Sequence, residues 1–349
     1  MKLFITGGAG FIGSNFIRHV LGRARKYSVV NYDALTYAGN LGNLEAVAGD
    51  ARYSFCKGDI CDASAVEGAM AGCDAVVHFA AESHVDRSIY EPGAAVRTNV
   101  IGTFTLLEAA RKLRIPRFIH ISTDEVYGDV AAGKFADEAW ALQPSSPYAA
   151  SKAGADLLVR SYVRTYQFPA IVTRTSNNYG PYQFPEKLVP LLTSNALEEK
   201  ALPIYGDGKQ ERTWLHVEDH CRGLAAVLAR GKLGEIYNIS GADVTDNVSM
   251  ARTILRICGK PESLIGHVED RPGHDRRYAT TSRKIETELG WKPEISLDEG
   301  LRQTIDWYRN NSKWLAGVRD GEYRSYYQKN YENRAASLNS ATESKPPAN

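Results

Sequence analysis

The chain has 349 residues, of which 43% are hydrophobic and 24% are charged, and these ordinary globular values exclude a disordered chain, a collagen and a coiled coil. Its length exceeds the ~250–300 residues at which a single core stops growing, so we expect one large α/β unit that carries a second, smaller lobe. Lysine and arginine total 42 against 41 for aspartate and glutamate, so the chain lacks the overall basic field that nucleic-acid or anionic-membrane binding requires.

The five cysteines include no C-x-x-C pair, which fits neither a disulfide framework nor a zinc ribbon. Met1 and Lys2 lead directly into a short apolar run, and no apolar stretch approaches the ~18 residues of a membrane span. His84 and His274 have no second metal ligand three or four residues further on. The sequence therefore predicts a cytoplasmic protein without a membrane segment or a metal site.

Short apolar runs alternate with helix-length amphipathic segments over the first 175 residues. The runs span residues 3–6, 28–32, 53–56, 75–79, 118–122 and 170–173. The first five are nearly continuous apolar strings, as expected for strands that are buried on both faces of a parallel sheet. Six strand–helix units in sequence predict an α/β fold with a doubly wound, Rossmann-type parallel sheet.

The rhythm changes after residue 175, where turn-rich stretches separate shorter strands. We expect residues 1–175 to form the sheet domain. Residues 176–331 are expected to form mainly a smaller C-terminal α/β lobe, with some return to the core, that covers the mouth of the sheet. A last helix is expected over 300–313, and the polar, proline-tipped segment 335–349 is expected to be disordered.

The strand at 3–6 ends in a glycine-rich turn. Gly8, Gly10 and Gly13 fit G-x-G-x-x-G, while Gly7, Gly10 and Gly13 fit the G-x-x-G-x-x-G variant. Such a pattern also occurs in ordinary tight turns between a strand and a helix. Here it opens the first of a series of βα units, where a helix N-terminus can face a pyrophosphate, so we predict a dinucleotide site.

Asp33 ends the second expected strand, about 20 residues after Gly13, where a carboxylate would accept a hydrogen bond from a ribose 2′-hydroxyl. The alternative is an ordinary turn residue at a strand end. Ala34 follows it, rather than an arginine that could bind a 2′-phosphate. The sequence therefore favours NAD over NADP.

Tyr148 and Lys152 lie four residues apart in an expected helix, so they project from one face. A phenol with a pKa of about 10 is a useful base near neutrality only if a cation lowers that pKa, which a nearby ammonium group can do. The pattern alone also fits a solvated surface pair. Combined with the glycine turn and with Thr123 at the end of the fifth strand, it predicts a proton-transfer site beside the dinucleotide.

These motifs resemble those of the extended short-chain dehydrogenase/reductase family, and the resemblance runs from Met1 to about Tyr331. More narrowly, the chain resembles the dTDP-glucose 4,6-dehydratases of that family in four segments, at residues 81–88, 123–128, 176–183 and 271–277. The doublet Asp124-Glu125 distinguishes the dehydratases from the related 4-epimerases, which usually lack an adjacent acid and base after the threonine. A solvated loop doublet is the alternative interpretation of these two residues.

The resemblance implies a reaction in which dTDP-glucose becomes dTDP-4-keto-6-deoxyglucose. Tyr148 would take the O4 proton while C4 gives a hydride to NAD, Glu125 would remove the C5 proton, and Asp124 would protonate the leaving O6 hydroxyl. The same NAD would then return the hydride to C6. Two adjacent carboxyls can share this work only if one is protonated and the other ionised, which like-charge repulsion favours.

The resemblance also implies which residues contact the ligands. The catalytic residues would be Thr123, Asp124, Glu125, Tyr148 and Lys152. Tightly bound NAD would contact Gly7, Gly10, Phe11, Ile12, Gly13, Asp33, Ala34, Leu35, Thr36, Asp59, Ile60, Phe79, Ala80, Ala81, Ser83, Thr98, Tyr148, Lys152 and Asn178. The nucleotide sugar would contact Ser83, His84, Thr123, Asp124, Glu125, Asn177, Lys187, Leu188, Pro203, Tyr205, Arg212, Asn247, Arg271 and His274.

Two other functions remain open at this point. A sugar-nucleotide 4-epimerase would use Tyr148 and NAD but would not need Asp124 and Glu125, and a silent NAD-sensing regulator would not need the Tyr148–Lys152 pair. The base of the nucleotide (dTDP, UDP, GDP or CDP) is not read from the sequence. Members of the resembled family commonly form homodimers, which suggests a homodimer through helices near residues 91–113 and 148–166.

Overall fold

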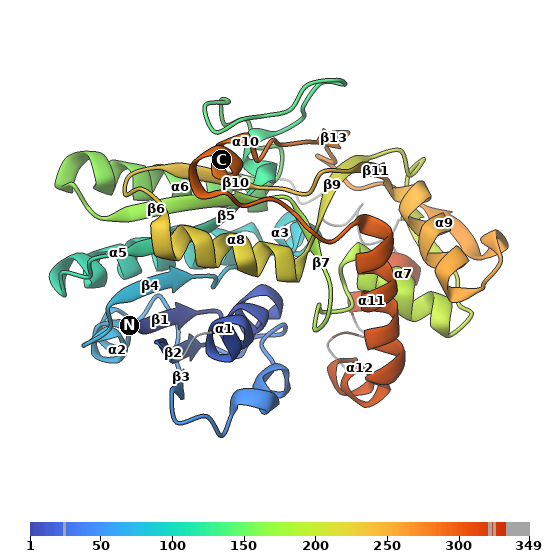
Figure 1. Ribbon diagram of the computed structural model, residues 1–349. Coiled ribbons are helices and arrows are strands. Elements are labelled where there is room, and N and C mark those ends of the chain that lie inside the picture. Colours follow the sequence, from blue (N-terminus) through green and yellow to red (C-terminus); the bar gives the residue numbers. More distant parts are fainter. Residues whose placement is uncertain (24–25, 320–322, 324–325, 333–349) are drawn as a thin grey trace, which may run out of the picture.

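Seven parallel strands form the central sheet of the protein (Figure 1). This computed structural model describes residues 1–23, 26–319, 323 and 326–332, and the tail predicted at 335–349 lies outside them. The strand order is β10-β6-β5-β4-β1-β2-β3, so the winding direction reverses beside β1, as in a doubly wound sheet. The strands are β1 (Lys2–Thr6), β2 (Ser28–Asp33), β3 (Tyr53–Lys57), β4 (Ala75–His78), β5 (Phe118–Thr123), β6 (Ala170–Thr175) and β10 (Ile236–Ile239).

The six predicted strands are confirmed, but the expectation that the first five are buried on both faces is wrong for β3. Ser54 and Lys57 of that strand are exposed. The reason is its position, because β3 is an edge strand that pairs only with β2. At the other edge, β10 pairs with β6, so a segment from the second half of the chain completes the sheet.

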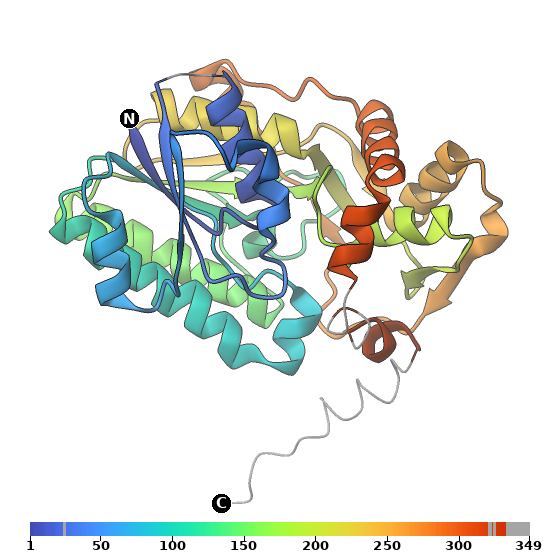
Figure 2. The same ribbon diagram turned by 90° about the horizontal axis from the view of Figure 1, so that it is seen from below.

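Helices cover both faces of the sheet, as Figure 2 shows. Successive residues of β1 face opposite layers: Leu3 and Ile5 pack in the cluster that contains Phe16, whereas Phe4 packs in the one that contains Leu106. One layer consists of α1 (Phe11–Arg23), α8 (Val217–Arg230) and α10 (Arg283–Leu289), and the other of α2 (Ala63–Met70), α5 (Thr103–Lys112) and α6 (Pro147–Tyr166). The connecting segments hold η1 (Leu41–Val47), α3 (Val85–Tyr90), α4 (Pro92–Ala95), η2 (Val96–Gly102) and η3 (Asp124–Tyr127).

The remaining elements form a smaller lobe beside the carboxyl ends of the strands (Figure 1). A sheet of β11 (Val244–Asp246), β9 (Glu211–His216), β13 (Arg277–Tyr278) and β7 (Asn177–Tyr179) lies next to the pair β8 (Leu202–Tyr205) and β12 (Ile265–Val268). The lobe also contains α7 (Leu188–Leu197), α9 (Asn247–Cys258), η4 (Glu262–Leu264), α11 (Leu297–Asn310), α12 (Ser312–Val318) and η5 (Gln328–Glu332). Leu192, Ile254 and Ile305 lie in its separate apolar core.

The helix predicted at 300–313 is α11, which begins three residues earlier and ends at Asn310. The expectation that it is the last helix is wrong, because α12 follows it. Asn311 separates the two helices, and its side chain donates to the carbonyl of Trp307 at 2.8 Å. That local hydrogen bond offers the backbone an alternative to continuing the helix. Within the described part of the chain, no helix is both long and apolar enough to cross a bilayer.

Candidate active site

A groove of about 350 Å³ lies at the carboxyl ends of the strands of the central sheet. This is the edge at which open parallel sheets hold their ligands. Of the nineteen residues predicted to contact NAD, all except Leu35 line the groove. The five predicted catalytic residues line it as well.

The glycine turn lets backbone form the floor of this groove. A Cβ atom on Gly7 would lie 2.5 Å from the amide nitrogen of Ala80, and one on Gly13 would lie 2.3 Å from the carbonyl oxygen of Gly7. Gly7 also has a φ of +68°, which disfavours other residues. Both positions therefore need glycine, and the turn leaves the start of α1 open to a pyrophosphate.

Asp33 lies at the end of β2, with its carboxylate held by two backbone amides. Oδ2 accepts from Ala9 at 2.9 Å and Oδ1 accepts from Leu35 at 2.8 Å. Burial raises the pKa of this carboxyl, and the two amides oppose the rise. Each oxygen keeps a further lone pair, so Asp33 and the glycine turn together fit the ribose and the pyrophosphate of a dinucleotide. Leu35 has a φ of +55° and contributes its amide to this arrangement rather than a surface of the groove.

Two segments bring the predicted catalytic side chains together. Thr123, Asp124 and Glu125 lie where β5 passes into η3, and the Thr123 hydroxyl accepts from the Glu125 amide at 3.2 Å. Tyr148 and Lys152 lie on the first turns of α6, and the hydroxyl of Tyr148 forms a hydrogen bond with the side chain of Thr123. The Lys152 ammonium donates to the carbonyl of Ile121 at 2.7 Å. The two segments thus form one site rather than a surface pair and a loop doublet.

The start of α6 is fixed by local sequence. The Ser146 hydroxyl accepts from the Ala149 amide at 3.1 Å as the N-cap, and Pro147 occupies the first turn. Serine at this cap and proline in the first turn both favour a helix start. The Tyr148 amide donates to the hydroxyl of Ser88 at 3.1 Å, which ties the helix to α3.

The adjacent carboxyls lie in different electrostatic surroundings. Burial raises the pKa of Asp124 to about 8, and the charge of Glu125 adds to this rise. Burial also raises the pKa of Glu125, but Arg271, Lys187 and Arg212 all oppose it. Asp124 therefore keeps its proton near neutral pH, and Glu125 is the carboxyl better placed to ionise. Among the residues that the structure describes, Asp124 Oδ2 and Glu125 Oε2 are buried without a hydrogen-bond partner.

The expected lowering of the pKa of Tyr148 by Lys152 is outweighed in the protein alone. Burial, followed by the charges of Glu125 and Asp124, raises the pKa of Tyr148. Burial lowers the pKa of Lys152 to about 8, and Asp156 opposes this change. The spacing of Tyr148 and Lys152 shows the nearby cation but not the desolvation of both groups, which here has the larger effect. The surroundings of Tyr148 in the protein alone therefore oppose its ionisation.

A buried ion pair, missed by the sequence reasoning, links the two catalytic segments. Arg174 on β6 donates from Nε to Asp156 Oδ2 at 2.8 Å and from a terminal nitrogen to the hydroxyl of Tyr127 at 2.9 Å. Asp156 lies one turn after Lys152 on α6, and Tyr127 lies two residues after Glu125. In the sequence, only the i+4 spacing of Asp156 from Lys152 indicated a link to the catalytic site. Arg174 gave no such indication, because the pattern around it indicates only a strand.

The residues predicted for the nucleotide sugar are more widely spread than those for NAD. Ser83, Asn177 and Lys187 line the groove with the catalytic residues. The Lys187 ammonium donates to the carbonyl of Ser83 at 2.6 Å. Groove-lining residues to which the sequence assigned no ligand contact include Tyr32, Glu82, Gln183, Phe184 and Glu186.

The other predicted sugar-nucleotide residues lie outside the groove lining, mostly on the lobe. Arg212 and Arg271 are near enough to the carboxyls to affect the pKa of Glu125. Tyr205 donates to Asp86 at 2.8 Å, and its ring lies 6.2 Å from that of His274. His84 contacts Tyr326, while Leu188, Pro203 and Asn247 lie on or next to α7, β8 and α9.

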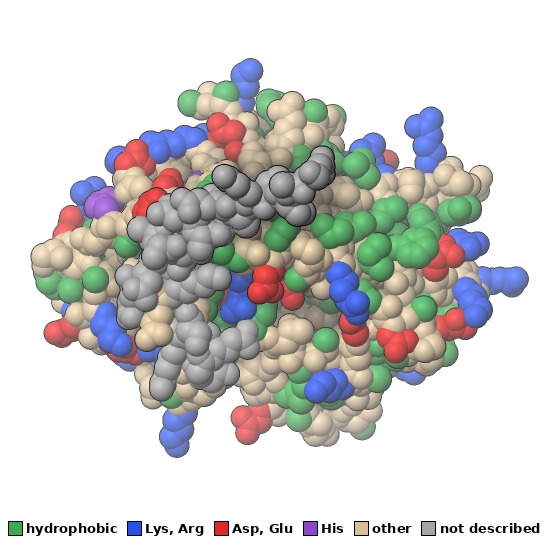
Figure 3. All heavy atoms as spheres, turned by 180° about the vertical axis from the view of Figure 1, so that it is seen from behind, with side chains coloured by type: hydrophobic (Ala, Val, Ile, Leu, Met, Phe, Trp, Pro, Cys, Tyr) green, Lys and Arg blue, Asp and Glu red, His purple; other side chains and the backbone are tan. Residues whose placement is uncertain are grey.

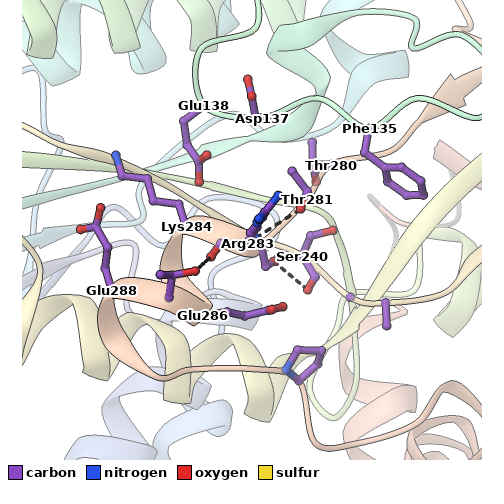
Figure 4. Close-up of a pocket in the computed structure, with 15 residues that line it drawn as sticks. Phe135, Asp137, Glu138, Ser240, Thr280, Thr281, Arg283, Lys284, Glu286 and Glu288 are labelled. Atoms are coloured by element: carbon purple, nitrogen blue, oxygen red, sulfur yellow. Dashed lines mark hydrogen bonds between the residues drawn. The ribbon is translucent and has the colours of Figure 1, made fainter.

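A second cavity, of about 760 Å³, lies away from these residues, between the loop at Phe135 and the start of α10 (Figure 4). Two of its charged side chains have local partners: Glu138 accepts from the amide of Asn238 at 2.8 Å, and Lys284 donates to Glu235 at 2.5 Å. None of the predicted catalytic residues lines it. Although this cavity has the larger volume, the side chains that line the groove assign the functional site to the groove.

A doubly wound sheet with this glycine turn, this ribose-side carboxylate and a Tyr–Lys pair defines an enzyme of the extended short-chain dehydrogenase/reductase class. Comparisons with known proteins agree with this class and indicate a narrower family within it. Residues 4–304 match the family model described as GDP-mannose 4,6 dehydratase. The dTDP-glucose 4,6-dehydratase of Shigella flexneri is 51% identical, with 96% of this chain and 100% of that protein covered. The chain belongs to the dTDP-glucose 4,6-dehydratase family.

Solved structures support the same assignment. The dTDP-glucose 4,6-dehydratase DesIV from Streptomyces venezuelae, determined with NAD bound, has a TM-score of 0.89 at 49% identity, with 91% of this chain and 100% of that one covered. The NAD complex of the enzyme from Bacillus anthracis has a TM-score of 0.86 at 44% identity, with 91% and 99% covered. A UDP-glucose 4-epimerase from Thermus thermophilus is similar in fold, with a TM-score of 0.82, but only 30% identical, with 89% and 100% covered.

Proposed function

We propose that the protein is an NAD-dependent dTDP-glucose 4,6-dehydratase, a hydro-lyase that converts dTDP-glucose into dTDP-4-keto-6-deoxyglucose and water. The observation that carries the proposal is the pair Asp124 and Glu125 beside Tyr148, each with a buried oxygen atom that lacks a protein partner in the described structure. A 4-epimerase needs no such pair. Relatives that are 49–51% identical bear this name, whereas the epimerase quoted above is 30% identical.

The first step is oxidation of the sugar at C4. Tyr148 removes the proton from the O4 hydroxyl, and Thr123, which forms a hydrogen bond with Tyr148, holds the same oxygen. Bound NAD supplies the acceptor for the C4 hydride, later the donor to C6, and a positive charge in its oxidised ring. Asp33 and the glycine turn hold the cofactor, and Lys152 binds its nicotinamide ribose.

The second step is elimination of water across C5 and C6 of the 4-ketone. The new carbonyl acidifies the hydrogen on C5, and Glu125 removes it as the general base. The C5–H electron pair forms the C5=C6 bond, the C6–O6 bond breaks, and Asp124 protonates O6 so that water leaves. After reduction at C6, Glu125 returns a proton to C5. The raised pKa of Asp124 suits it to the acid role at neutral pH.

The nucleotide half of the substrate brings two phosphates to a nearly neutral protein, so particular donors must bind them. We assign Arg212 to a phosphate, because its planar fork matches phosphate oxygens. Asn177 and Asn247 are the amide donors, with Arg271 and His274 close to them. The base pocket is formed by Lys187, Leu188, Pro203 and Tyr205, and Ser83 faces the sugar, whereas both ring nitrogens of His84 have protein partners. The names of the relatives favour dTDP as the nucleotide.

The experiment that tests this function uses dTDP-glucose with deuterium at C4. We expect the product to carry the deuterium at C6 and to acquire one solvent hydrogen at C5, because Glu125 exchanges its proton with water. A 4-epimerase would return the label to C4 with the hydroxyl inverted and leave C5 untouched. A silent regulator would give no product. Deuterium found in water or in free NADH would contradict internal hydride transfer.

We further propose a homodimer formed through η2, α5 and α6. Large hydrophobic side chains are exposed on these helices: Ile101 (49%), Phe104 (45%) and Leu157 (53%). Hydrophobic side chains gather on this face of the molecule in Figure 3. Leu157→Glu is expected to give a monomer in light scattering after gel filtration, and an unchanged mass would contradict the proposed interface.

The five cysteines are free, which supports a reducing compartment such as the cytoplasm.

A further inference from the structure

The loop between β7 and α7 runs along the dinucleotide groove and is tied to the central sheet domain at both ends. Gln183, Phe184 and Glu186 from this loop line the groove together with the glycine turn. At its first end, the Asn15 side chain on α1 donates to the carbonyl of Pro181 at 3.0 Å. The loop is therefore part of the wall that a bound dinucleotide must pass in order to leave.

The second end of the loop is held by three side chains, Tyr37, Arg87 and Glu186, which we term the groove clasp. The guanidinium carbon of Arg87 lies 3.7 Å from the centre of the Tyr37 ring, and Arg87 Nε donates to Glu186 Oε2 at 3.2 Å. A hydrogen bond between Tyr37 and Glu186 closes the triangle. The Tyr37 ring also packs edge-on against Phe184, with 5.8 Å between ring centres.

The clasp joins three separate elements at the cofactor. Tyr37 lies four residues after Asp33, and its neighbours Thr36 and Ala38 both line the groove. Arg87 belongs to α3, and Glu186 belongs to the loop that leads into the lobe. Opening the groove at this point must therefore separate the segment next to the ribose from the lobe loop.

Burial makes the clasp costly to open. The Glu186 side chain is 1% exposed, and a carboxylate this deeply buried is unfavourable without a charged partner. Lys187 and Arg87 both supply that charge. Arg87 adds a planar stacking surface for Tyr37 and a directed N–H group, a combination that lysine cannot reproduce. None of the three residues has a part in the proton transfers assigned above, so their role must be sought in the cofactor groove itself.

We propose that Arg87 is a positioning residue that, through Tyr37 and Glu186, holds the loop closed on NAD and slows release of the cofactor. This inference rests on the proposed function. A dehydratase that returns its cofactor to the oxidised state in every turnover has no need to exchange it. Release after the first step would instead leave a 4-keto sugar without its hydride.

The test measures release of NAD from loaded protein without any sugar nucleotide. Protein saturated with NAD is mixed with excess NAD that carries deuterium in the nicotinamide ring, and the bound cofactor is followed over time by mass spectrometry. Arg87→Met is expected to release NAD at least about tenfold faster than the unaltered chain, since weakened contacts act mainly on dissociation. Arg87→Lys, which keeps only the charge, is expected to give an intermediate rate.

Two further variants make the result specific. Arg256→Met is the matched control, because Arg256 pairs with Asp298 on the exposed surface of the lobe, and its release rate should be unchanged. Tyr37→Phe deletes only the hydroxyl that bonds Glu186, so it tests the same clasp if Arg87→Met does not fold.

Wild-type release rates in the folded Arg87 and Tyr37 variants would overturn the proposal. Because no sugar is present, faster release would support the clasp even if the protein failed to dehydrate dTDP-glucose. A chain that bound no NAD at all would refute both the clasp and the proposed function.

Discussion

Arg174→Met is expected to destabilise the protein strongly, because Arg174 is the buried partner of two groups. Its side chain is 1% exposed and that of Asp156 is 0% exposed. The hydrogen bond to the Asp156 carboxylate is worth about 1.5–3 kcal/mol, and the bond to the Tyr127 hydroxyl is worth about 1 kcal/mol. Together these give roughly 2.5–4 kcal/mol, which overlaps the range of about 3–5 kcal/mol found when one partner of a buried pair is removed.

Urea unfolding with NAD at one fixed, saturating concentration measures this loss. A double-mutant cycle with Asp156→Leu separates the pair from the cost of each residue, since the double variant leaves neither charge unpaired. We expect the double variant to be at least about 2 kcal/mol more stable than the sum of the single losses predicts. Tyr162→Phe on the same helix, which loses only a partly exposed bond to Glu108, serves as a control.

The ion pair also has a predicted consequence for catalysis. Since Arg174 links Tyr127 in η3 to Asp156 in α6, its loss should loosen the acid–base doublet relative to Tyr148. We expect kcat to fall by more than KM changes in Arg174→Met at temperatures where the variant is folded. Additive stability losses in the cycle, or an unchanged kcat, would refute the view that this pair joins the two catalytic segments.

Three further outcomes are expected. Glu125→Gln should still oxidise C4 but lose about 10²–10⁴ in the rate of dehydration, and 4-keto-6-deoxy product formed within a few-fold of the wild-type rate would contradict its role. Asp33→Ala should weaken NAD binding and relax the rejection of NADP; equal affinity of the unaltered chain for both cofactors, by titration calorimetry, would contradict this. Because the folded pKa of Asp124 is about 8 and its unfolded value is near 4, this group lowers stability as the pH rises between those values. Asp124→Asn should therefore be roughly 1–4 kcal/mol more stable than wild type at pH 8 but not at pH 4, and a pH-independent difference in urea unfolding would count against the raised pKa.

The sequence predicted the parts of the fold that depend on local patterns. The buried strands have continuous apolar runs, and the glycine turn has a spacing that few other structures require, so both could be located by residue number. The predicted role of Gly13 depends on a backbone contact only six residues away, with Gly7. Asp33 could be located in the same way, because β2 brings it to the same edge of the sheet as the turn.

Features that depend on distant segments were predicted less fully. Some return of residues 176–331 to the core was expected, but nothing in the local pattern of residues 236–239 indicates that β10 is the returning strand or that Ile236 pairs with Val172. The raised pKa of Tyr148 was missed for a similar reason. Spacing along α6 shows that Lys152 is near, but not that both groups are desolvated by surrounding segments.

The division of labour between the two carboxyls also depends on the lobe. Asp124 and Glu125 come from the central sheet domain, whereas Lys187, Arg212 and Arg271, the cations that oppose the rise in the pKa of Glu125, come from the lobe and the loop that leads to it. Without these cations, much of the electrostatic difference between Glu125 and Asp124 would be lost. The protonated form of Glu125, which cannot act as a base, would then be favoured. An acidic doublet in a sequence thus becomes an acid and a base only when the lobe that carries these cations is in place over it.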